Sequence, residues 1–128
     1  MTEMPEWYQR FEQAMHGHVA PGQRFVAEKD PEYMEAFLAF TTKLFTRPGN
    51  EISPEVREVI VIAIQAALGA WDPVRGHTRR ALVNGVSPKM ILEGMEIAAM
   101  AAGVGALFGG AEVLAEELEL AGQEFPEN

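Results

Sequence analysis

The segment between Asp72 and Glu93 gathers basic side chains around a histidine in a chain that is otherwise acidic. The chain has 19 acidic and 10 basic residues, yet this segment has no acid between its two ends. Imidazole titrates closest to neutral pH and suits proton transfer, and a guanidinium can hold a carboxylate through two parallel hydrogen bonds. The segment predicts an anion-binding pocket with a general acid or base, or alternatively a solvated helix face. The histidine of this segment is His77, and its basic residues are Arg75, Arg79, Arg80 and Lys89.

Helical spacing divides these side chains between two faces. Residues three or four apart are neighbours on a helix surface, so Arg75 and Arg79 share one face. His77 and Arg80 share another face, which Asn84 continues. The second face therefore combines a titratable group, a fixed cation and an amide.

Glu58 is the second candidate for chemistry. It precedes an apolar run by one residue, and Ile62 and Gln65 continue its face at helical spacing. A carboxylate there would be partly buried and would need a partner, because an unpaired buried charge is costly. His77 or an arginine of the next helix could supply that partner. The alternative is an exposed glutamate at a helix start, close to Arg57.

Metal and cofactor sites have little support in the sequence. His16 and His18 flank Gly17 and could bind a metal from a loop, but no third ligand lies near them. Trp71, before the helix that carries His77, either walls a pocket or fills the core. The glycine-rich segments follow helices, whereas a dinucleotide-binding loop follows a strand. We therefore expect neither a metal nor a cofactor.

Helix-start signals show which elements must position these residues. An Asp or Ser can accept a hydrogen bond from the first helical turn, and proline fits the first helical position because its missing N–H would be unpaired there anyway. Four dipeptides of this kind predict four helix starts. They are Asp30-Pro31, Ser53-Pro54, Asp72-Pro73 and Ser87-Pro88.

The whole pattern predicts an all-α fold of six helices, with a loop over residues 17–28. The helix that contains Glu58 is apolar nearly all round from Val59 to Ala70, which is typical of a bundle centre or a subunit interface. Residues 94–111 are rich in glycine and alanine, which predicts a close helix–helix seam, either within the chain or between subunits. The predicted helices cover residues 5–15, 31–45, 54–68, 73–83, 88–102 and 106–120.

Length and composition exclude several classes of protein. A chain of 128 residues fits one domain, and its lack of cysteine excludes disulfides, thiolate metal sites and thiol catalysis. The net charge of −9 argues against nucleic-acid binding, which needs a basic face. No segment resembles a signal peptide or a membrane span. We expect a soluble protein, located in the cytoplasm, with no nucleic-acid or membrane partner.

Glu58 and His77, 19 positions apart, carry a resemblance to a known family. The segment GAWDPVRGH over residues 69–77 joins two predicted helices, and RALVNGVS over residues 80–87 closes the second of them. In order and spacing these features resemble the carboxymuconolactone decarboxylase family and its alkylhydroperoxidase AhpD-like relatives. The resemblance covers residues 31–118, and it implies one domain over 1–128. That domain comprises an N-terminal helix and loop (1–29), the family core (31–118) and an acidic tail (119–128).

The chain departs from the AhpD-type peroxidases at two positions. Those proteins have cysteines seven and four residues before the histidine, where this chain has Ala70 and Pro73. A peroxidase relay has nothing to act on without these thiols. The resemblance therefore points to the cysteine-free, decarboxylase-like branch, and it implies an all-helical AhpD-like bundle that assembles as a trimer or hexamer.

The resemblance implies a lyase or isomerase that acts on a small unsaturated carboxylate or lactone without a cofactor. In that hypothesis Arg80 or Arg75 holds the anionic substrate, His77 is the acid–base group and Glu58 orients or polarises it. Trp71 and Gln65 then shape the pocket. The alternative is an oligomeric small-molecule-binding protein that has the fold but no catalysis.

Overall fold

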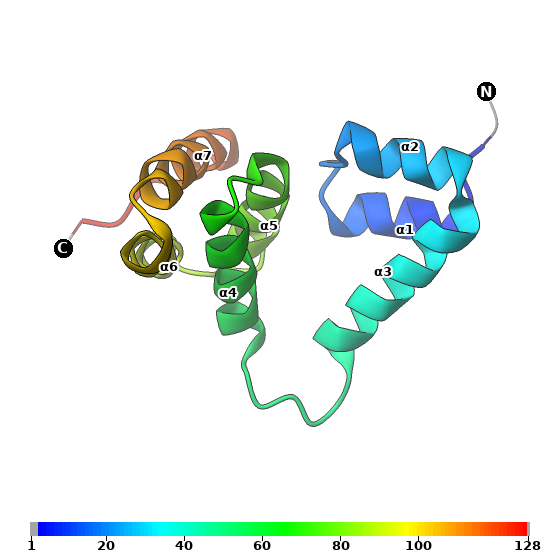
Figure 1. Ribbon diagram of the computed structural model, residues 1–128, viewed down its shortest axis with the longest axis horizontal. Coiled ribbons are helices and arrows are strands. Elements are labelled where there is room, and N and C mark those ends of the chain that lie inside the picture. Colours follow the sequence, from blue (N-terminus) through cyan, green and yellow to red (C-terminus); the bar gives the residue numbers. More distant parts are fainter. Residues whose placement is uncertain (1–2, 128) are drawn as a thin grey trace. The chain divides into compact units, whose positions relative to one another are not determined.

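The computed structural model describes residues 3–127, and every regular element within that range is an α-helix (Figure 1). This confirms the predicted all-α class. Seven helices are described instead of the six predicted. They are α1 (Glu6–Ala14), α2 (Pro21–Lys29), α3 (Pro31–Thr46), α4 (Pro54–Ala67), α5 (Trp71–Val83), α6 (Pro88–Ala102) and α7 (Gly105–Ala121).

The additional helix is α2, and it corrects the prediction of a loop over residues 17–28. Proline again stands in the first turn, but the residue before it is Ala20, whose methyl side chain cannot accept a hydrogen bond. The cap comes from within the helix instead. The Gln23 side-chain oxygen accepts the backbone N–H of Ala20 at 3.0 Å. A search for Asp or Ser before proline therefore misses this helix start.

Three of the four predicted helix caps are present. The side chains of Asp30, Ser53 and Ser87 each accept a backbone N–H from the first turn of the helix that follows, at 3.2 Å. The fourth prediction is wrong by two residues. Helix α5 begins at Trp71, with Ala70 as its N-cap, so Pro73 lies inside the first turn.

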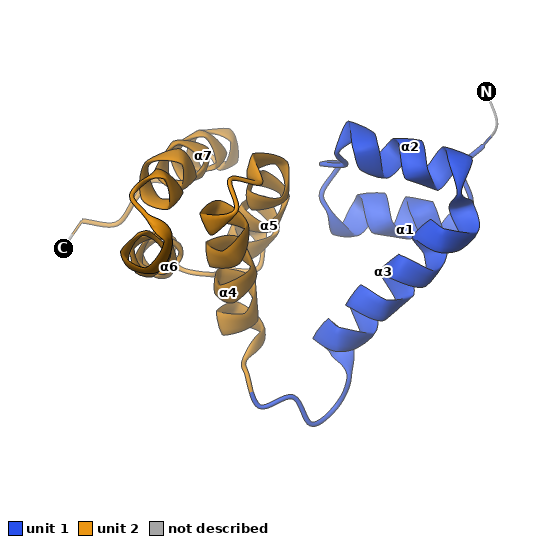
Figure 2. Ribbon diagram, in the orientation of Figure 1, with its two compact units in different colours: residues 1–51 blue, residues 52–128 orange. Residues whose placement is uncertain are grey.

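The chain forms two compact units, divided after Glu51 (Figure 2). The first contains α1, α2 and α3 around a small core of Tyr8, Ala27 and Met34. The division lies inside the predicted family core, so α3 is grouped with the N-terminal helices. The assignment of residues 1–128 to one domain stays a prediction.

The second unit, from Ile52 onward, contains α4 to α7 and the larger core. Its glycines permit close helix packing. A Cβ atom on Gly94 of α6 would lie 2.5 Å from Cγ1 of Val59 on α4, and one on Gly110 of α7 would lie 2.8 Å from the Met95 sulfur on α6. The small-residue seam is thus present inside this unit. Its fully buried side chains include Ile62, Val74, Ile91 and Met95.

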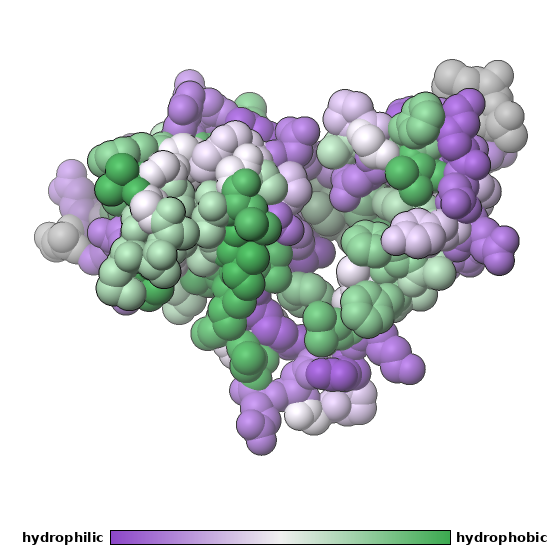
Figure 3. Space-filling view, in the orientation of Figure 1, coloured by the Kyte–Doolittle hydropathy of each residue, from purple (hydrophilic) through white to green (hydrophobic). Residues whose placement is uncertain are grey.

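Helix α4 is buried on one face only. Ile62 and Ala66 lie in the core, whereas an apolar stripe on the opposite face is 40% to 73% exposed. Figure 3 shows hydrophobic side chains gathered along this helix. Within residues 3–127, no helix is long and apolar enough to cross a membrane. The α4 stripe consists of Val56, Ile60, Ile64 and Leu68.

Candidate functional site

Glu58, His77 and Arg80 form one cluster between α4 and α5. Nδ1 of His77 lies 3.2 Å from Oε2 of Glu58. The other carboxylate oxygen, Oε1, accepts a hydrogen bond from Nη2 of Arg80, which also lies 3.3 Å from the His77 Nδ1. The sequence analysis left open whether Glu58 is exposed or has His77 or an arginine as its partner, and the structure places it against both His77 and Arg80.

A short helical hairpin builds the cluster. Helix α4 ends at Ala67, and the chain reverses through Gly69, whose φ of +68° is a conformation that side chains with a Cβ rarely adopt. Helix α5 then returns alongside α4. Glu58 is in the second turn of α4, and His77 and Arg80 are one turn apart on the facing side of α5.

The carboxyl group of Glu58 is held as a carboxylate. The residue is 6% exposed, and burial alone would raise its pKa. The hydrogen bond from His77 and the positive charge of Arg80 outweigh burial and lower the pKa of Glu58 below its usual value. At neutral pH this group accepts hydrogen bonds and has no proton to donate.

The charge on Glu58 also decides how His77 is protonated. A carboxylate accepts hydrogen bonds only, so Nδ1 of His77 forms a hydrogen bond with Glu58 only when it carries a proton, even though Nη2 of Arg80 also lies 3.3 Å from it. We therefore assign Nδ1–H to His77, which leaves Nε2 as the nitrogen that can exchange a proton with a ligand. The side chains of His77 and Arg80 are 21% and 22% exposed, so a small molecule can reach both.

A second ionic network occupies another side of α5. Arg79 donates through Nε and Nη2 to both carboxylate oxygens of Glu117 on α7, at 3.0 and 2.9 Å. Arg75 lies 2.7 Å from the Glu116 carboxylate and 3.7 Å from that of Glu117. Arg75 is thus already paired with carboxylates and lies on a different face from His77.

The sequence analysis did not identify Glu117, which is only 2% exposed. It is one of six glutamates in residues 112–128, and the sequence analysis assigned no role to any of them. A signal was available, because Val113 and Leu114 precede it by four and three residues on the apolar face of the helix. An acid in the middle of such a face is expected to be buried with a partner.

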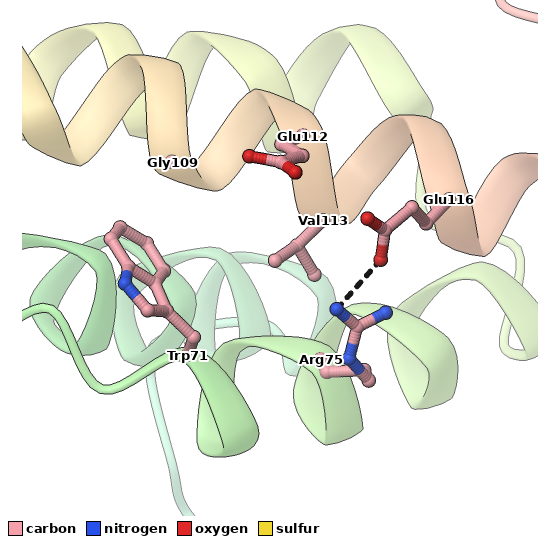
Figure 4. A pocket seen from close by; sticks show the side chains of 6 residues that line it. All are labelled: Trp71, Arg75, Gly109, Glu112, Val113 and Glu116. Carbon is pink, nitrogen blue, oxygen red and sulfur yellow. Dashed lines mark ion pairs between the residues drawn. The ribbon is translucent and has the colours of Figure 1, made fainter.

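The remaining predicted residues lie apart from the cluster. Trp71 and Arg75 line a hollow of about 180 Å³ between α5 and α7 (Figure 4). Trp71 also lines a second hollow, of about 320 Å³, with the end of α4 and the α6–α7 turn. Gln65 is half-buried two turns beyond Glu58, about 10 Å along the helix axis. Neither hollow is lined by Glu58, His77 or Arg80.

Metal ligands are not gathered anywhere in the described part of the chain. Among residues 3–127, no group of three or more His, Asp or Glu side chains is placed to hold an ion. His16 is exposed and has an unusual φ of +52° in the turn after α1. The structure therefore adds no third ligand to the pair of His16 and His18.

Comparison with known proteins gives a family match and a similar solved structure. The model of the carboxymuconolactone decarboxylase family matches residues 31–116, a span that includes all three residues of the cluster. The chain is also similar to the crystal structure of a protein from Burkholderia xenovorans LB400 that is provisionally assigned as a carboxymuconolactone decarboxylase. The two are 23% identical, with a TM-score of 0.74 over 89% of this chain and 90% of the other. No curated protein matches the chain.

Proposed function

The chain belongs to the carboxymuconolactone decarboxylase family, and on that premise we propose that it is a cofactor-independent lyase or isomerase. Its substrate is a small unsaturated carboxylate or lactone. One observation supports this proposal most strongly. A buried, ionised Glu58 lies against Nδ1 of His77, beside the cationic Arg80, so that Nε2 is the ring nitrogen not engaged by the carboxylate.

Each residue of the cluster has a distinct task in the proposed reaction. In a decarboxylation, the bond to the departing carbon dioxide breaks and its electron pair moves into the conjugated carbonyl, which gives a dienolate. Arg80 stabilises the negative charge. Protonated His77 then donates its Nε2 proton to carbon, and Glu58 stabilises the imidazolium that makes this donation possible. In an isomerisation, Nε2 removes and returns the proton.

Arg80 is our choice for the residue that binds the substrate anion. The sequence left Arg80 and Arg75 as alternatives, but Arg75 is paired with two carboxylates on the α7 side. Arg80 shares its face with His77, and a guanidinium has five N–H donors, so it can contact Glu58 and a ligand together. The roles of Trp71 and Gln65 in shaping the pocket stay predictions.

Replacement of His77 tests the proposed chemistry. Purified protein is screened against muconolactones and related unsaturated acids, and His77→Ala is then assayed on any substrate found. We expect turnover to fall by at least about 100-fold, because general acid–base catalysis contributes that much or more. His16→Ala, at an exposed histidine outside the cluster, is the matched control. Full activity of His77→Ala would overturn the mechanism.

A non-catalytic binding protein with this fold is the second candidate. It is favoured by one observation, namely that the cluster of Glu58, His77 and Arg80 lines neither hollow. The same screen separates the two candidates, because a binding protein would bind members of the panel without converting them. Peroxidase activity is not expected, since the chain has no cysteine. A peroxide assay with a dithiol donor should show no turnover above the blank.

We also propose that the protein self-associates as a trimer or hexamer. The exposed α4 stripe supports this, because a row of apolar side chains of this length is unfavourable in water. Light scattering after size-exclusion chromatography should give a trimer or hexamer mass for the wild type and a smaller mass for Ile64→Asp. Glu119→Lys, at an exposed acid on α7, is the control and should keep the assembly. A monomeric wild type would contradict the proposal. The cytoplasmic location stays a prediction.

A further inference from the structure

The hollow between α5 and α7 has the features of a second ligand site (Figure 4). Trp71 and Arg75 are one turn apart on α5, and Glu112 and Glu116 are one turn apart on α7. Gly109 and Val113 complete the lining. The hollow thus has two ends, one between Arg75 and Glu116 and the other between Trp71 and Glu112.

The two ends differ in how their charges are matched. At one end, Arg75 and Glu116 neutralise each other across 2.7 Å. At the other end, Glu112 has no hydrogen bond or ion pair with any described residue, and its carboxylate points toward the Trp71 end in Figure 4. The lining therefore has two carboxylates and one guanidinium, which leaves one negative charge unmatched.

The indole of Trp71 is held in place within the same hollow as this charge. A Cβ atom on Gly109 would lie 2.4 Å from Cζ2 and Cη2 of the indole, so the ring rests directly against the α7 backbone. The side chain is still 37% exposed and forms one wall of the hollow. The face of a tryptophan attracts cations more strongly than that of any other aromatic residue.

We propose that this hollow binds a small organic cation, with an ammonium or guanidinium group between the Trp71 indole and the Glu112 carboxylate. The indole supplies a cation–π contact and the carboxylate supplies the counter-charge. An anion is disfavoured there, because it would have to separate Arg75 from Glu116 and Glu117. The site is thus opposite in charge preference to the cluster around His77, and it does not depend on the proposed reaction.

Direct binding measurements test the proposal without any assay of turnover. The probe is n-butylammonium, and n-pentanol and butyrate are the neutral and anionic controls of similar size. Binding is followed by Trp71 fluorescence in a Trp7→Phe background and independently by calorimetry. We expect saturable binding of the cation at millimolar concentration, weakened by added salt, and no saturation by either control.

Two substitutions locate the site. Glu112→Gln should weaken binding of n-butylammonium about fivefold, the effect of one partly exposed charge pair. Trp71→Leu should weaken it about tenfold, measured by calorimetry. Glu93→Gln, at an exposed glutamate on α6, should bind as the wild type does. The proposal is overturned if the wild type shows no saturation up to about 50 mM, if n-pentanol binds equally well, or if Glu112→Gln binds unchanged.

Discussion

On two sides of α5 a buried glutamate is paired with basic side chains, but the chemistry of those partners differs. On the α4 side, buried Glu58 is paired with His77 and Arg80. On the α7 side, buried Glu117 is paired with Arg79 at 3.0 and 2.9 Å and with the more distant Arg75. Each side places one glutamate of low exposure against two basic residues of a single helix.

The difference lies in which partner can release a proton. Guanidinium groups stay protonated at any physiological pH, so the α7 side is a fixed pair of charges that holds two helices together. The α4 side contains an imidazole, the kind of side chain that serves as a general acid or base in catalysis. A buried ion pair is therefore insufficient evidence for a catalytic site, and the titratable partner is what distinguishes the two.

The largest expected effect is on turnover, which we expect to depend on the α4 side of α5 and not on the α7 side. Glu58→Gln removes the charge that orients His77 and stabilises its imidazolium, so we expect turnover to fall by about 100-fold on any substrate found. Glu117→Gln should keep turnover within a few-fold of the wild type, after correction for the folded fraction. Steady-state rates of both variants provide the measurement. Equal losses in the two variants would show that the difference between the sides is not catalytic.

The next largest effect is on the free energy of unfolding and concerns the α7 side of α5. Glu117→Ala leaves the guanidinium groups of Arg79 and Arg75 partly buried without their shared counter-ion. Removal of one member of a buried pair costs about 3–5 kcal/mol, and the partial exposure of both arginines places our expectation near the lower limit, at about 3 kcal/mol. Urea denaturation measures this free energy of unfolding. A loss below about 1 kcal/mol would mean that Glu117 does not hold the helices together.

The dependence of stability on pH tests the α4 side by itself. The pKa of Glu58 is lowered in the folded chain, so its carboxylate stabilises the fold above the usual glutamate pKa of about 4.3. That contribution is lost as the pH falls through the folded-state pKa. Glu58→Gln should therefore lose stability less steeply than the wild type in acid, as measured by thermal unfolding across this range. Parallel curves would contradict the assigned ionisation.

The smallest effect concerns the exposed neighbour of Glu117. Glu116 pairs with Arg75 at 2.7 Å, but its side chain is 46% exposed, and solvent-exposed pairs contribute about 0–1 kcal/mol. Glu116→Ala should therefore lower the free energy of unfolding by less than about 1 kcal/mol. If it costs as much as Glu117→Ala, burial is not what makes the α7 network strong.

Much of the fold was predictable from local signals, because proline and capping residues act within one helical turn. Asp30, Ser53 and Ser87 identified their helices correctly. Helix α2 was not identified because its cap comes from Gln23, three residues after the N-cap residue instead of at it. A pattern based on the N-cap residue alone cannot detect that arrangement.

The site was predictable to the extent that it depends on one helical hairpin. Glu58 and His77 lie on neighbouring helices joined by a short turn, so the sequence was enough to name His77 as a possible partner of Glu58. The partner of Arg79 was not predictable from its own helix, because Glu117 lies on α7, beyond α6. The hollow beside Trp71 likewise depends on how closely Gly109 lets α7 approach, which only the three-dimensional arrangement shows.

The separation of partners along the chain has a consequence for the order of folding. Glu58 and His77 are 19 residues apart, whereas Arg79 and Glu117 are 38 apart. The entropy lost in closing a chain segment grows slowly with its length, at about 0.6 kcal/mol for each doubling. The α4–α5 hairpin can therefore form before α7 docks, and we expect substitutions at the Glu58 contact to slow folding more than those at Glu117. The Glu117 contact would then mainly limit the rate of unfolding.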